Sequence, residues 1–132
     1  MTPLAPYLFY EDVAHAARFL SEAFGFTLGF TSPDPAGGLA HAQLHHKDGL
    51  IMLGHAGEGG LGKVKKASAL PALHAGIYVF VDDVDLHHTR AKQAGANVLL
   101  PPADQPWGDR MYCATDPEGQ FWMFAKRIQT GG

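Results

Sequence analysis

The strongest constraint on this chain is an internal repeat. The segment Tyr7–Val13 (YLFYEDV) reappears as Tyr78–Val84 (YVFVDDV), and each copy is followed by a helical pattern that stops near Gly25 or Gly95. A repeat of this kind fixes the architecture before any single residue is given a role. We therefore expect two structurally equivalent halves.

Each half predicts the order strand, helix, strand, strand, strand. The turn Asp48-Gly49 in the first half corresponds to Glu118-Gly119 in the second. Together they predict an α+β fold of eight strands and two principal helices, with each helix covering one sheet face. We expect one domain over residues 1–132, with module 1 at about 4–54, an exposed connector at 55–72 and module 2 at about 73–127.

Local signals place the elements within each module. Asp12 is an N-cap candidate, and apolar residues at helical spacing run from Val13 to Phe24. Strands are expected at 4–10, 26–31, 39–45 and 50–54, with a hairpin at Lys47-Asp48-Gly49. In the second half, strands at 111–115 and 121–126 flank the turn Asp116–Gly119.

Composition excludes several classes of function. A net charge of −3 without basic runs argues against nucleic-acid binding, and no apolar run approaches membrane-spanning length. The first residues lack a signal-peptide pattern, and the single Cys113 cannot form an internal disulfide. We expect a cytoplasmic protein that binds neither membranes nor nucleic acid. We expect Cys113 to be a buried, inert thiol.

The stretch Pro106–Phe124 (PWGDRMYCATDPEGQFWMF) carries a family resemblance. It resembles the last hairpin of the vicinal-oxygen-chelate superfamily of glyoxalase I, extradiol dioxygenases and bleomycin-resistance proteins. Its Trp-Gly-Asp-Arg form is most similar to bleomycin-resistance and glyoxalase-like members, and the resemblance spans about residues 4–127. It implies two sheets curved around a shared cup, and a C2 homodimer, which is common among such proteins.

The resemblance also locates the positions where enzymes of the superfamily bind a divalent metal. Counting along the repeat places them at Ala5, Gly76, Met123, and either Met52 or Leu53. Alanine, glycine and leucine have no donor atom, and a thioether is a weak ligand for Mg, Mn, Ni or Zn. We expect no metal, no cofactor and none of the usual metal-dependent activity.

Histidines provide the alternative metal site. His41 and His45 share one strand face with Gln43, and His74 is expected at the rim of the second module. A rearranged site at these three histidines stays open, although polar wall residues are the simpler interpretation. The adjacent pair His87 and His88 is expected on the surface of the second helix.

The cup itself is predicted to be aromatic. Strand alternation places Tyr7 and Phe9 on the face of Ala5, and Tyr78 on the face of Gly76. Trp107 stands where bleomycin-resistance relatives place a ligand-stacking Trp. The predicted ligand-binding residues are Tyr7, Phe9, Met52, Tyr78, Trp107 and Met123.

Three further side chains are expected to be structural. Trp122 and Phe124 are predicted to lie under a helix. Arg110 could pair with Asp109 or Asp116 or recognise an anion, and we favour the structural role.

Two classes of function follow. The first is a metal-free, non-catalytic protein that sequesters an aromatic or glycopeptide-like ligand, as in antibiotic resistance. The second is a lyase, isomerase or dioxygenase-like enzyme of the same fold with a displaced metal site. A domain whose ligand is unrelated to drugs is a third hypothesis, because fold alone does not choose among them.

Overall fold

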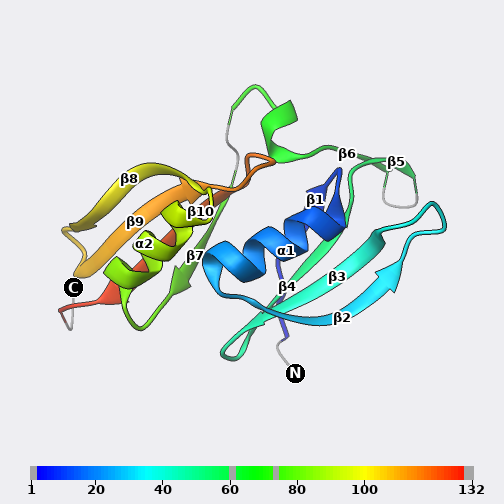
Figure 1. Cartoon of the computed structure of the whole chain (residues 1–132). Coiled ribbons are helices and arrows are strands. Elements are labelled where there is room, and N and C mark those ends of the chain that lie inside the picture. The colour runs from blue at the N-terminus through cyan, green and yellow to red at the C-terminus, as the bar shows by residue number, and fades with distance from the viewer. Residues whose placement is uncertain (1–2, 60–61, 73–74, 130–132) are drawn as a thin grey trace.

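The computed structural model describes residues 3–59, 62–72 and 75–129 of the chain. Two four-stranded mixed sheets are each covered by one helix, which confirms the predicted α+β fold (Figure 1). The first half consists of β1 (Tyr7–Tyr10), α1 (Val13–Phe24), β2 (Thr27–Pro33), β3 (Leu39–His46) and β4 (Gly49–His55). The second consists of β7 (Gly76–Phe80), α2 (Val84–Gln93), β8 (Asn97–Asp104), β9 (Asp109–Thr115) and β10 (Phe121–Arg127).

The repeat predicted from the sequence extends to the sheet order and to the pairing of the parallel strands. The sheet orders β1-β4-β3-β2 and β7-β10-β9-β8 are equivalent. Tyr7 of β1 pairs with Met52 of β4, and Tyr78 of β7 pairs with Met123 of β10, both in parallel. Met52 is therefore the counterpart of Met123, whereas Leu53 is buried in the core.

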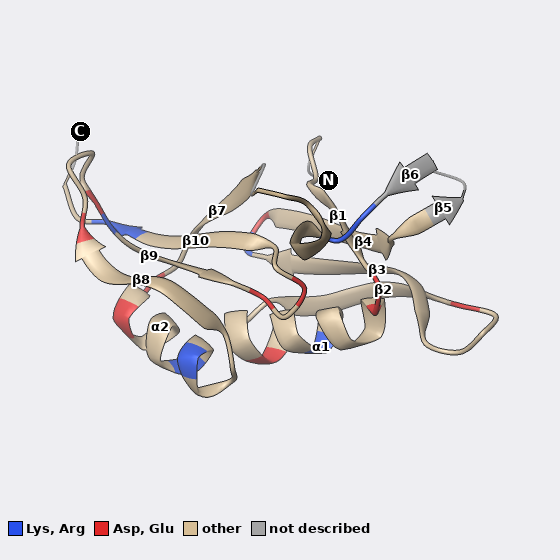
Figure 2. Ribbon diagram, turned by 90° about the horizontal axis from the view of Figure 1, so that it is seen from above, with Lys and Arg blue, Asp and Glu red and all other residues tan. Residues whose placement is uncertain are grey.

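Both helices lie on the same side of the two sheets (Figure 2). The opposite faces of the curved sheets form the cup, which is open on the side away from the helices; we refer to these as the open faces. The helix side holds one continuous core, because Trp122 of β10 contacts the rings of both Phe24 and Phe26 from the first half. Trp122 and Phe124 are fully buried there, as predicted.

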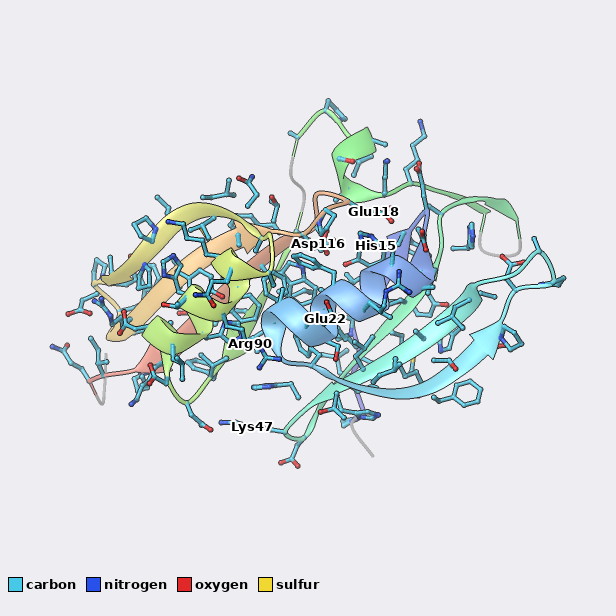
Figure 3. The ribbon with its side chains drawn as sticks, in the orientation of Figure 1. His15, Glu22, Lys47, Arg90, Asp116 and Glu118 are labelled. Atoms are coloured by element: carbon cyan, nitrogen blue, oxygen red, sulfur yellow. The ribbon has the colours of Figure 1, made fainter. Side chains whose placement is uncertain are left out.

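Helix α1 begins and ends where the sequence predicts. The Asp12 side chain accepts a hydrogen bond from the backbone nitrogen of His15, and Gly25 ends the helix with a left-handed φ of 79°. His15, Glu22, Arg90 and Glu118 are labelled in Figure 3.

Module 2 supplies partners at both ends of this module 1 helix. At the start, the Glu118 carboxylate accepts from the backbone nitrogens of Glu11 (2.6 Å) and Asp12 (3.0 Å). At the end, the Arg90 guanidinium donates to the carbonyls of Ser21 and Glu22. The ends of a helix leave backbone groups without their full set of helical hydrogen bonds, and here the second module supplies additional partners at both ends.

A third contact at this end of α1 corrects one prediction. His87 is half-buried rather than on the surface, since its Nε2 lies 2.8 Å from the Phe24 carbonyl and its ring packs on Phe124. Packing of α2 against α1 turns this histidine inward, while His88 contacts the edge of Tyr112.

The segment after β4 has more structure than an exposed connector. It contains the short hairpin β5 (Gly57–Gly59) and β6 (Gly62–Val64), followed by the 3-10 helix η1 (Ala67–Ala69). The backbone nitrogen of Ser68 donates to the Glu118 carbonyl, and a Cβ on Gly119 would stand 2.8 Å from the Ser68 side chain. Gly119 also has a φ of 88°, so both its conformation and its neighbour require glycine.

In the described part of the chain, neither helix has the length and apolar character that crossing a membrane requires.

Candidate functional site

The predicted site residues lie on the open faces in two groups, one on each module. In module 1, the rings of Tyr7 and Phe9 are 5.3 Å apart, and Met52 pairs with Tyr7 across the strands. In module 2, Met123 pairs with Tyr78 in the same way. The structure thus brings the six predicted residues together in threes, one set on each module, and places Trp107 in the second set.

The open face of module 1 forms a cleft of about 950 Å³. Ala5 and Met52, two of the positions where a metal ligand was sought, both line it. The other lining residues are Pro3, Gln43, His45, Asp48 and Leu50. The lining is therefore apolar on β4 and near the N-terminus, and polar along β3 and at Asp48 in the turn that follows it.

The polar residues of β3 are engaged with one another. Nδ1 of His41 lies 3.2 Å from the Tyr7 hydroxyl, and its Nε2 lies 3.2 Å from the amide nitrogen of Gln43. Because the amide nitrogen can only donate, Nε2 of His41 accepts and Nδ1 carries the hydrogen. The His45 ring lies against the backbone of Gly29, where an added Cβ would be 2.7 Å from its Nε2.

In module 2 side chains occupy the space next to Gly76, the counterpart of Ala5. A Cβ on Gly76 would stand 2.6 Å from the Phe121 ring and 3.1 Å from the terminal carbon of Met123. A larger residue at Gly76 would have to displace Phe121.

These four positions do not fit a divalent metal. Ala5 and Gly76 offer no donor atom, and Met52 and Met123 offer only thioethers. Within the described residues there is no cluster of three or more His, Cys, Asp or Glu that could hold an ion. His74, part of the alternative histidine site, lies outside the described residues.

Trp107 precedes β9 and is 47% exposed, as a rim residue should be. Its indole Nε1 donates to the Tyr78 hydroxyl over 3.1 Å, and that hydroxyl donates to Oδ2 of Asp109 over 2.7 Å. Burial and the carboxylate raise the pKa of Tyr78, although the hydrogen bond from Trp107 opposes this. Tyr78 is therefore a neutral donor to Asp109.

Asp109 was missed as a site residue by the sequence analysis. It is only 2% exposed, and its Oδ1 lies 2.6 Å from Nε of Arg127. The available signal was its place in strand alternation, where an acid begins the open-face row that continues with Met111 and Cys113.

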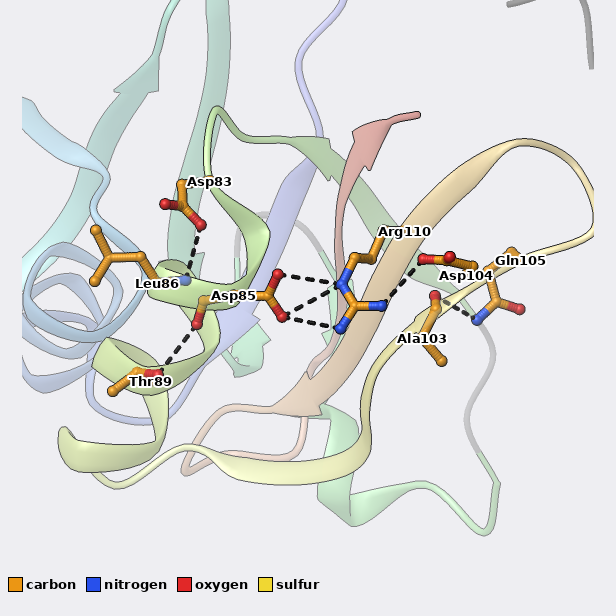
Figure 4. Close-up of polar contacts among 8 residues, drawn as sticks. All are labelled: Asp83, Asp85, Leu86, Thr89, Ala103, Asp104, Gln105 and Arg110. Carbon is orange, nitrogen blue, oxygen red and sulfur yellow. Dashed lines mark hydrogen bonds and ion pairs between the residues drawn. The ribbon is translucent and has the colours of Figure 1, made fainter. Parts of the chain in front are cut away.

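The predicted partners of Arg110 are wrong. Arg110 binds Asp85 of α2 with two nitrogens and Asp104 of β8 with a third, all at 3.0–3.3 Å (Figure 4). Neither Asp109 nor Asp116 takes part. The preferred structural role is nevertheless consistent with these bonds, which connect α2 to the edge strand.

Cys113 is buried on β9, and burial raises the pKa of its thiol. A thiol with a raised pKa is a poor nucleophile at neutral pH, which agrees with the inert thiol predicted.

The comparisons with known proteins agree with this geometry. The sequence profile of the Glyoxalase/Bleomycin resistance protein/Dioxygenase superfamily matches residues 3–124. The chain belongs to this superfamily. An uncharacterised protein of Mycobacterium bovis is 33% identical over 127 residues, which cover 96% of this chain and 84% of the relative.

Solved structures extend the likeness. TioX from Micromonospora sp. ML1 has 32% identity and a TM-score of 0.77, covering 97% of this chain and 100% of TioX. A glyoxalase-related enzyme from Clostridium phytofermentans has a TM-score of 0.71, covering 97% of this chain and 96% of that one. At 17% identity this second likeness concerns the fold alone.

Proposed function

We propose that this superfamily member is a metal-free binding protein that sequesters a flat aromatic or glycopeptide-like small molecule in its apolar cup. The observation that carries the proposal is the matched Tyr–Met pair on both open faces, in which the methionine stands at a position where superfamily enzymes bind a metal. Aromatic rings and thioethers bind flat apolar molecules by burial and by stacking.

The open faces have surface to offer such a ligand. Phe30 and Phe80 are 61% and 47% exposed, and Trp107 is exposed to a similar degree. Apolar patches of this kind mark binding or interaction surfaces. The cleft in module 1 also falls within the 300–1,000 Å³ range of small-molecule sites.

A homodimer is part of this proposal. In one chain both open faces point away from the helices, so a ligand bound to either leaves one side exposed. A second copy related by a two-fold axis would cover both faces with equivalent surfaces. Sedimentation velocity at micromolar concentration is expected to show a dimer, and a monomer there would require the cup of one chain to bind alone.

The binding test uses two probes, bleomycin and 2-naphthol, titrated against the full chain by calorimetry. At least one of the two probes is expected to bind the cup saturably. A chelator should leave the affinity for that probe unchanged. Absence of heat with both probes would contradict a ligand of this chemistry.

A metal assay separates this function from the enzyme hypothesis. After dialysis against Zn, Ni and Mn, elemental analysis is expected to find no stoichiometric metal. One tightly held ion per chain would overturn the metal-free proposal and direct attention to His41, His45 and His74.

A further inference from the structure

We propose that Asp109 is a positioning residue that sets the orientation of the Trp107 indole through the Tyr78 hydroxyl. This inference rests on the proposed function for its consequence in ligand binding. The hydrogen-bond chain itself stands on its own and can be tested without a ligand.

The direction of the chain is fixed by chemistry. An ionised carboxylate only accepts, so the Tyr78 O–H must point at Oδ2 of Asp109. The phenolic oxygen then presents its lone pairs, and the indole N–H of Trp107, which only donates, points at them. Each group decides the orientation of the next.

The other carboxylate oxygen of Asp109 faces Arg127. This Oδ1 lies 2.6 Å from Nε, in an ion pair whose angle does not make it a hydrogen bond. Burying a carboxylate costs much less free energy beside an opposite charge than without one. Arg127 places that positive charge next to the carboxylate that accepts from Tyr78.

The arrangement also defines what the ligand meets. The N–H of Trp107 and the O–H of Tyr78 are both used within the protein, so the pair presents ring surfaces without a free donor. The chemical class selected is a flat ring that is recognised by its π face, and polar substituents gain nothing from these two residues.

The matched control is Tyr7, which has the same register in module 1. Its hydroxyl contacts His41 instead of an indole and a carboxylate. Tyr7→Phe and Tyr78→Phe therefore remove the same atom from equivalent positions. Only Tyr78→Phe breaks the hydrogen bonds that connect Asp109 to Trp107.

The test uses the two indole N–H signals of the 15N-labelled full chain, assigned with Trp107→Phe. In Tyr78→Phe the Trp107 signal is expected to shift and its hydrogen to exchange about fivefold faster, as for one lost hydrogen bond. The Trp122 signal, held by Asp116, is expected to stay in place, and Tyr7→Phe should move neither.

Asp109→Asn distinguishes positioning from a general structural role. Asp109→Asn is expected to move the Trp107 signal in the wild-type background. In Tyr78→Phe it should add nothing, because the hydrogen bonds between Asp109 and Trp107 are already broken. Equal effects in both backgrounds, or an unmoved Trp107 signal in Tyr78→Phe, would overturn the inference.

Affinity for 2-naphthol supplies the functional readout. Tyr78→Phe is expected to weaken binding about fivefold and Tyr7→Phe less. If wild-type protein does not bind 2-naphthol while the indole signals behave as expected, the ligand class of the proposed function fails and the positioning of Trp107 stands.

Discussion

Asp116 and Asp109 are the two buried acidic residues in the described part of the chain, at 5% and 2% exposure. Each accepts a hydrogen bond from a tyrosine on the first strand of a module: Tyr10 donates to Asp116 over 2.6 Å, and Tyr78 to Asp109 over 2.7 Å. Each also lies at the end of a path from a tryptophan N–H. Their surroundings are nevertheless opposite.

Asp116 is saturated and lies on the helix side, between the modules. Its Oδ2 accepts from Tyr10 and Trp122, and its Oδ1 accepts from the backbone nitrogens of Glu118 and Gln120. Burial raises its pKa, although these four bonds oppose the shift. Asp109 instead has one buried oxygen without a hydrogen bond and a charged partner at the surface.

The difference separates two uses of a buried carboxylate. A saturated one ties elements together and cannot respond to a ligand, whereas one at the end of an exposed chain can orient residues that meet a ligand. We therefore expect changes around Asp116 to cost folding stability, and changes around Asp109 to cost binding.

The largest expected effect is on the buried tryptophan. Trp122→Ala should lower the free energy of unfolding by about 3–5 kcal/mol, as large-to-small core changes do. The indole packs against the rings of both Phe24 and Phe26, so its removal would leave a cavity in the core. Urea denaturation would measure the loss, with Trp107→Ala as the control, expected to cost about 1 kcal/mol or less. The reverse order would mean that the two faces are wrongly assigned.

Asp116→Asn is expected to cost about 2–4 kcal/mol of stability, since buried donors would lose their acceptor. Both carboxylate oxygens face two donors each, so the amide nitrogen meets donors in either orientation. Thermal melts against Asp109→Asn would compare the two carboxylates. A larger loss in Asp109→Asn would reverse their proposed roles.

Much of this comparison could be predicted from the sequence, and what could not be predicted has a physical reason. The predictions included the ends of α1, the turn at Gly119, the strand faces and the burial of Trp122, because periodicity and turn chemistry are local. The aromatic open faces followed from alternation along β1, β7 and β10.

The partners of charged residues were not predicted. Arg110 binds Asp85 and Asp104, and Asp109 binds Arg127, because strand pairing and helix packing bring distant positions together. For the same reason, the sequence could show that His87 and His88 diverge, but not which one faces the other module. The hairpin β5–β6 was missed because a glycine-rich sequence is typical of a loop.

Trp107→Ala is expected to weaken binding of a flat aromatic probe by about 1–3 kcal/mol, the range for a stacked and partly buried aromatic ring. Calorimetric titration of 2-naphthol would measure it, with Phe30→Ala as the comparison, because Phe30 is also an exposed aromatic residue on the open face of module 1. Equal losses in both variants would mean that the ligand does not distinguish the modules, and the contrast between the two carboxylates would lose its functional meaning.

The smallest expected effect is pH dependence on the helix side, at His87. Its Nε2–H donates to the Phe24 carbonyl, so the neutral ring accepts at Nδ1 from the Tyr112 hydroxyl. Burial lowers the pKa of His87 first, and the charges of Arg90 and His46 lower it further, against the hydrogen bond to Phe24. The unfolded chain therefore binds the proton more tightly, and stability should fall as pH drops below about 6.5 toward the depressed pKa.

His87→Gln should cost about 1 kcal/mol of stability at pH 7 and should reduce the loss of stability at acid pH. His88→Gln, at the neighbouring position, should keep that loss. Urea denaturation at several pH values between 7 and 5 measures both; an acid loss that persists in His87→Gln would place the titrating group elsewhere than in this joint.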